Sequence, residues 1–195
     1  ETPILQPLYG GAAARPFKTH HNTLDMDLYL RIANELYLKR LIVGGFEKIY
    51  EINRNFRNEG VSSKHNPEFT MIEFYQTYCN YLDMMDTTEE LLKYVVNQVK
   101  GKSLINYQGH DLDFGKPFKR MTLKNSILEH ERSLKKDDIN DIDKLTKFCN
   151  KENIDISKYS SIGEIQFALF EKIVESNLLE PTFITEYPIE VSPLA

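Results

Sequence analysis

The stretch that most limits how this chain can fold is residues 51–75, EINRNFRNEGVSSKHNPEFTMIEFY. Its pattern predicts a strand, a polar loop and a second strand. Side chains alternate between the two faces of a strand, so the odd-numbered residues of each arm share one face. These residues are Glu51, Asn53, Asn55, Arg57 and Glu59 in the first arm, and Phe69, Met71, Glu73, Tyr75 and Thr77 in the second.

That odd-numbered face has two interpretations. Ordinary half-exposed strands also alternate, so a solvated surface explains the pattern about as well as a binding site does. The mixture of residue types favours a binding site, because arginine, glutamate, phenylalanine and tyrosine side by side suit a ligand with several kinds of chemical group.

The chemistry of the face indicates which groups such a ligand would carry. An arginine offers a planar fork for phosphate or carboxylate oxygens, and a phenylalanine offers an apolar platform for a flat ring such as adenine. Glutamates beside a tyrosine suit an ammonium group, which cannot be buried without a partner. The loop adds Lys64 and His65, two donors for a polyphosphate. Together these groups predict a nucleotide and an amino acid as ligands.

Composition limits the class of protein. The 195 residues suffice for one domain, with room for an insertion, and 41% hydrophobic with 27% charged residues is typical of a soluble globular protein. A net charge of -5 does not favour a nucleic-acid surface, although a local patch would still serve RNA. The two cysteines, Cys79 and Cys149, predict no disulfide scaffold and favour a reducing, cytoplasmic location. We expect no membrane span and no signal peptide.

The first half of the chain is predicted to alternate loops, strands and one helix. Residues 1–23 are predicted to be loop, with Gly10 and Gly11 allowing close approach to a ligand. A strand over 25–32 precedes a helix capped by Asn34 and ended by Gly44. Glu35 falls in the first turn of that helix, where a carboxylate also suits the helix dipole, so its position has a purely structural explanation as well.

The second half is predicted to be richer in helix. Asp86 and Glu89 resemble a capping box for a helix that ends at Gly101. The remaining expectations are a hairpin over 104–114, a helix capped by Thr122, a small helical insertion over about 133–176 with a capping box at Ser161–Glu164, and a β-run over 181–188. An antiparallel α+β domain follows from this order.

The common catalytic motifs are absent from the sequence. It contains no GxxxxGK[ST], GxGxxG or GxSxG motif, and its five histidines form no HExxH pair. The adjacent His20 and His21 would point to opposite faces of a strand, so we expect no metal site there.

Several long strings resemble one family. The segments FRNEG and HNPEFTMIEFY are similar to motif 2 of class II aminoacyl-tRNA synthetases. Three more segments, GGAAARPFKTHHN, LYLRIANELYLKRLIVGGFEKIYEINRNFRNEG and PTFITEYPIEVSPLA, resemble the bacterial-type lysyl-tRNA synthetases. The resemblance covers nearly the whole chain and weakens in 133–176; motif 2 alone would leave the aspartate and asparagine enzymes open.

The resemblance implies a fold, a reaction and a set of site residues. The fold is an antiparallel sheet flanked by helices, and the reaction is ATP-dependent activation of L-lysine to lysyl-adenylate followed by transfer to tRNA(Lys). Arg57 would bridge the lysine carboxylate and the ATP α-phosphate as the catalytic residue. The other implied contacts are Glu59, His65, Asn66 and Phe69 for ATP, and Gly11, Glu35, Glu73 and Tyr75 for lysine.

The resemblance also implies that part of the family's domain lies outside this chain. Motif 1 is represented only by its final Pro3, and motif 3 and the anticodon-binding domain are missing. The ligands of Mg2+ are expected beyond Ala195, so no metal ligand is assigned here. The parent protein is expected to be a cytoplasmic homodimer, and the 195 residues alone are expected to be inactive. Two alternatives stay open: a lysine-activating paralogue that modifies a protein, and a non-catalytic nucleotide-binding fragment.

Overall fold

The computed structural model describes residues 1–63 and 65–192, and the chain divides into two compact units, residues 1–79 and residues 80 onward. Both units mix helices with strands, and three of the four sheets in the described residues are antiparallel. The expected α+β class, with antiparallel sheets, is therefore confirmed.

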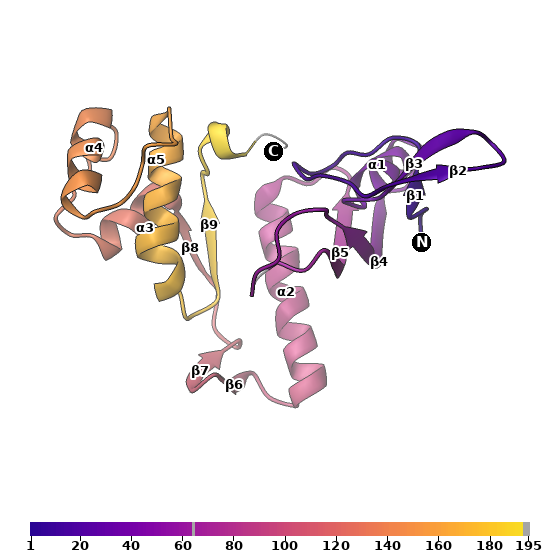
Figure 1. Cartoon of the computed structure of the whole chain (residues 1–195). Helices are drawn as coiled ribbons and strands as arrows, with labels where there is room; N and C mark the ends of the chain where they lie inside the picture. Colours follow the sequence, from indigo (N-terminus) through magenta and orange to yellow (C-terminus); the bar gives the residue numbers. More distant parts are fainter. Residues whose placement is uncertain (64, 193–195) are drawn as a thin grey trace. The chain divides into compact units, whose positions relative to one another are not determined.

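The first unit contains a small sheet, a helix and a long hairpin (Figure 1). Strands β1 (Leu5–Gln6) and β2 (Lys18–His21) flank β3 (Met26–Leu30) in an antiparallel sheet. Helix α1 (Glu35–Val43) follows and packs against the hairpin formed by β4 (Lys48–Phe56) and β5 (Glu68–Gln76). The prediction that residues 1–23 are all loop was wrong, since β1 and β2 lie in this segment. Each pairs with β3 through backbone hydrogen bonds, which side-chain patterns do not reveal.

The β4–β5 register keeps all odd-numbered residues on one face. Glu51 is paired with Glu73, and Asn55 with Phe69. Glu51 and Asn55 are buried, whereas Tyr50 and Ile52 on the even-numbered face are exposed. The polar face of this hairpin is therefore the inner one within the unit, the reverse of an ordinary half-exposed strand.

The second unit begins with the 20-residue helix α2 (Tyr81–Lys100). The capping box is formed by Asn80 and Asp83, so the prediction that this helix starts at Asp86 was wrong. Asn80 accepts from the backbone N–H groups of the first turn and Asp83 accepts from that of Asn80, and this pair lies six residues upstream of the predicted start. The helix ends at Gly101 in the left-handed conformation, as predicted.

The rest of the second unit contains two pairs of strands and further helices (Figure 1). The hairpin β6 (Leu104–Tyr107) and β7 (His110–Asp113) forms as predicted. Strands β8 (Lys119–Thr122) and β9 (Thr182–Thr185) pair in parallel, against the antiparallel expectation, because three helices connect them. These are α3 (Leu123–His130), α4 (Ile142–Lys151) and α5 (Ile162–Leu169), followed by the π-helical turn η1 (Phe170–Val174) and the short 3-10 turns η2 (Glu175–Asn177) and η3 (Ile189–Val191).

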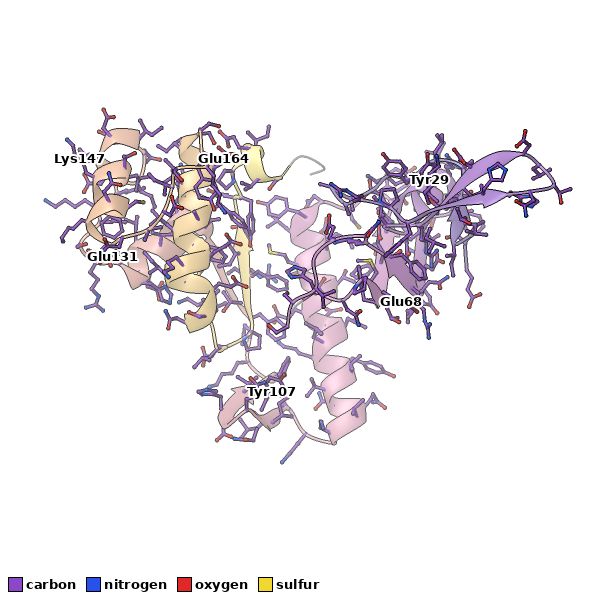
Figure 2. The ribbon with its side chains drawn as sticks, viewed as in Figure 1. Tyr29, Glu68, Tyr107, Glu131, Lys147 and Glu164 are labelled. Atoms are coloured by element: carbon purple, nitrogen blue, oxygen red, sulfur yellow. The ribbon has the colours of Figure 1, made fainter. Side chains whose placement is uncertain are left out.

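The core of the second unit is apolar and made mainly by these helices. Leu123, Ile127, Leu145, Leu169 and Val174 are fully buried in one cluster. Thr122 caps α3, and Ser161 with Glu164 (labelled in Figure 2) forms a capping box on α5, as the sequence predicts. Helices α4 and α5 lie within 133–176, and that this segment is an insertion stays a prediction.

Within residues 1–63 and 65–192, no helix combines the length and the apolar character needed to cross a membrane.

Candidate active site

The predicted ATP-binding residues come together at the loop end of the β4–β5 hairpin, between Phe56 and Phe69. A cleft of about 350 Å3 lies there. Its lining comprises Arg57, Glu59, Gly60, His65, Asn66, Pro67 and Phe69. All five residues assigned to ATP from the sequence are in this set, and Lys64 lies outside the described residues.

Arg57 and Phe69 form the inner part of this cleft. The guanidinium carbon of Arg57 lies 5.2 Å from the centre of the Phe69 ring, at the distance of a cation–π contact. Arg57 also donates through Nε to the backbone oxygen of Ile32, at 3.4 Å. These contacts fix the arginine stem and leave both terminal nitrogens of the guanidinium without a hydrogen bond to any described residue, so they are available to an anion.

The remaining residues of the cleft belong to the loop between the strands. Strand β4 ends at Phe56, so Arg57 and Glu59 lie beyond it and not within the strand as predicted. Arg57 is still bound to the segment that leads into β5, because its backbone N–H donates to the backbone oxygen of Pro67 at 2.8 Å. Glu59, His65 and Asn66 are exposed, and the His65 Nδ1 atom lies 2.8 Å from the Ser62 hydroxyl.

A second cleft adjoins the first and was missed by sequence reasoning. It shares Glu59 and Gly60 with the first cleft, has a volume of about 610 Å3, and is also lined by Tyr9 and Arg15. The Tyr9 ring lies 4.9 Å from that of Tyr29, which Figure 2 labels on β3. No pattern in the sequence links these residues, because they meet only through the fold of the N-terminal segment.

The predicted lysine-binding residues form a separate group beside α1. The Tyr75 hydroxyl donates to Oε1 of Glu73, and the backbone N–H of Asn34 donates to Oε2 of the same carboxylate at 3.3 Å. Burial, the hydrogen bond to Glu73 and the negative charges of Glu73 and Glu35 all raise the pKa of Tyr75. The tyrosine therefore stays neutral and serves as a hydrogen-bond donor at physiological pH.

Gly11 and Glu35 complete this group. Gly11 has a φ of +85°, and a Cβ built on it would lie 2.7 Å from the Cβ of Glu35. Only glycine allows this approach of the loop to the first turn of α1. Glu35 also pairs with Lys39 one turn further along, at 2.6 Å.

Asn34 has a different role from the one its sequence position predicts. It precedes α1, but its side chain makes no capping hydrogen bond. Its Nδ2 atom instead lies 3.5 Å from the backbone oxygen of Glu51, and its backbone binds Glu73. The residue thus ties the start of α1 to both strands of the hairpin, a function that helix-capping rules could not reveal.

No cluster of three or more histidine, cysteine, aspartate or glutamate side chains suited to a metal ion occurs in the part of the chain that the structure describes. His20 lies beside Asp25 and Asp27 on an exposed hairpin.

Comparison with known proteins identifies the family of the chain. The family described as tRNA synthetases class II (D, K and N) matches residues 1–195, so the chain belongs to this family of class II synthetases. Among curated proteins, it is 54% identical to a lysine–tRNA ligase of Thioalkalivibrio sulfidiphilus and 53% identical to those of Actinobacillus succinogenes and Legionella pneumophila. Each match covers 100% of this chain and 39% of the relative.

Proposed function

We propose that the whole protein carrying this chain is a lysine–tRNA ligase, which activates L-lysine with ATP and transfers it to tRNA(Lys). The observation that carries the proposal is the pairing of two groups in one unit: a cleft where the guanidinium of Arg57 lies over the ring of Phe69, and the partly buried, hydrogen-bonded pair of Glu73 and Tyr75. The first group suits a nucleotide, and the second suits an ammonium group. Identity of 53–54% to lysine–tRNA ligases supports lysine over aspartate or asparagine.

In the nucleotide cleft, Phe69 would stack on the adenine while Arg57 binds the α-phosphate. Its planar fork would also reach the lysine carboxylate, which holds the two reactants together. As the carboxylate attacks, negative charge grows on the phosphate oxygens, and the fixed guanidinium stabilises it. Groups of this kind contribute about 3–4 kcal/mol to transition states. Glu59, His65 and Asn66 would bind the rest of the nucleotide.

In the predicted lysine-binding group, Glu73 would accept hydrogen bonds from the side-chain ammonium of lysine. Tyr75 and the N–H of Asn34 hold both oxygens of its carboxylate in place. Glu35 and the backbone of Gly11 would bind the α-amino end. Aspartate or asparagine would leave the partly buried Glu73 without a cation and cover it from solvent, which disfavours them.

We further propose that the chain is part of a class II catalytic domain, an antiparallel sheet flanked by helices, in a cytoplasmic homodimer. Mg2+ would assist the ATP phosphates when bound, and the described residues gather no ligand set for it, so no step is assigned to it. Motif 3 and the anticodon-binding domain would lie elsewhere in the whole protein.

Lysine-dependent exchange of pyrophosphate into ATP tests this function. The whole protein should exchange with lysine and not with aspartate or asparagine, and Arg57→Ala should lower the rate about a hundredfold or more. Exchange driven by either competing amino acid would refute the lysine assignment.

Assays on the same whole protein distinguish two alternative functions. A lysine-activating paralogue would support exchange but would not charge tRNA(Lys), and would transfer lysine to a protein instead. A non-catalytic nucleotide-binding protein would bind ATP without any exchange. The 195 residues alone are expected to show no exchange.

A further inference from the structure

Glu51 lies beside Glu73 on the hairpin, so it adjoins the two carboxylates of the predicted lysine-binding group, Glu35 and Glu73, and the three have different partners. Glu35 is paired with Lys39, and Glu51 is paired with Arg31 at 2.9 Å. Glu73 receives hydrogen bonds from Tyr75 and Asn34, and no cation among residues 1–63 and 65–192 is paired with it. Glu51 would compete with Glu73 for a cation if its own charge were not offset.

Glu51 and Glu73 are direct neighbours across the hairpin. They are paired in the β4–β5 register and lie on the same face. Side chains in such positions have Cβ atoms about 5 Å apart, and like charges there destabilise the sheet. One of the two negative charges must therefore be offset by a positive charge nearby.

Arg31 supplies that positive charge from a fully buried position. Its Nη1 atom donates to Glu51 and to both oxygens of Thr2, and its Nε donates to the backbone oxygen of Arg54 at 2.9 Å. Arg31 is 0% exposed and Glu51 is 4% exposed. The buried pair is thus anchored to the N-terminal segment and to β4.

Glu51 is held in its ionised form. Burial alone would raise its pKa, but hydrogen bonds from Thr2, Asn53 and Arg31 outweigh this and lower the pKa to about 2. The charged groups facing Glu51 are Arg31, from the segment after β3, and Glu73, from β5. The Arg31–Glu51 pair is therefore neutral overall.

We propose that Arg31 is a positioning residue for the amine site: it neutralises Glu51, and thereby leaves Glu73 as the carboxylate that binds the ammonium group of the substrate. This inference rests on the proposed function. A purely structural ion pair is the competing explanation. The positioning role depends on the net charge of the Arg31–Glu51 pair. A structural role would depend only on how much the pair contributes to the free energy of unfolding.

The test is lysine-dependent exchange by the whole protein with three variants. Glu51→Gln leaves the Arg31 charge beside Glu73, so the KM for lysine should rise about tenfold or more, with the KM for ATP little changed. The double variant Arg31→Met with Glu51→Gln removes both charges and should bring the lysine KM back to within about threefold of the unmodified protein. Arg31→Lys keeps the positive charge, so its KM for lysine should also stay close to that of the unmodified protein.

Two outcomes overturn the inference: an unchanged lysine KM in Glu51→Gln, or a double variant as impaired as that single variant. Parallel loss of kcat and of affinity for both substrates, with lower thermal stability, would assign the pair a structural role only.

If Glu51→Gln does not fold, Arg31→Met provides a second measurement. Without its cation, Glu51 has a higher pKa, so the lysine KM should depend on pH in a range where that of Arg31→Lys is flat. Identical profiles in the two variants overturn the inference. Absence of lysine-dependent exchange by the unmodified protein would instead refute the proposed function, and the inference with it.

Discussion

Gly11 lies against Glu35 so closely that no side chain fits between them. The Cβ of an alanine at position 11 would come within 2.7 Å of the Cβ of Glu35. Glycine is required here both by the positive φ and by the contact with the first turn of α1.

Gly11→Ala should therefore impair lysine use selectively. Gly45 is a matched control, because its φ is +103° but a Cβ there would have no neighbour within 4 Å. Both substitutions carry the backbone cost of about 1 kcal/mol or more, and only Gly11→Ala should displace Glu35. We expect a severalfold higher lysine KM in Gly11→Ala alone, measured by pyrophosphate exchange. An equal rise in the lysine KM in both variants would show that Gly11 does not belong to the lysine-binding site.

Glu73→Gln should weaken lysine binding much more than ATP binding. A hydrogen bond to a charged group contributes about 1.5–3 kcal/mol, which corresponds to a roughly 10- to 100-fold rise in the lysine KM. Glu68→Gln is the control, since Glu68 (Figure 2) lies on the opposite face of β5 and is paired with the exposed Arg54. A comparable loss for both substrates would contradict the role of Glu73.

Phe69→Leu should give the complementary result. Stacking of a base on an aromatic ring contributes about 1–3 kcal/mol, so the KM for ATP should rise about fivefold or more while that for lysine changes little. Phe69→Tyr keeps the ring and should retain ATP affinity. If Phe69→Leu binds ATP normally, adenine does not stack at this position.

Glu51 should stabilise the fold at neutral pH and lose that effect in acid. Its folded-state pKa of about 2 lies below the ordinary value of 4.5. The contribution is therefore fully present above about pH 4.5 and disappears as the pH falls towards 2, and it is on the order of 3 kcal/mol. Urea unfolding of the 195-residue chain between pH 2 and 7 measures it. Glu51→Gln should flatten the dependence on pH in that range, and an unchanged slope would contradict the assignment.

The sequence predicts the hairpin and its odd-numbered face well, because the period of two is a local property. The same holds for the caps at Thr122 and Ser161, whose partners lie three residues away. It does not predict the Arg31–Glu51 pair, since the two residues are 20 positions apart and both suit an exposed strand. It also misplaces Asn34, because a capping rule considers only the helix that follows and not the strand that receives its side chain.

The assignment of nucleotide residues depends on the loop between the strands as much as on parity. Arg57 and Glu59 follow the end of β4, and the loop brings them to Phe69. The loop, a tertiary feature, places them there. The odd-numbered pattern therefore grouped Arg57 and Glu59 with Phe69 correctly, although it assumed a first strand that continues past Phe56.

The pairing of β4 with β5 also limits how this gene can vary in length. Adding or deleting one codon between Phe69 and Tyr75 would turn Glu73 or Tyr75 to the opposite face, where Tyr50 and Ile52 lie. Such a change would exchange a carboxylate for an apolar side chain in a single step. Insertions and deletions of a single residue should therefore be eliminated within the two strands.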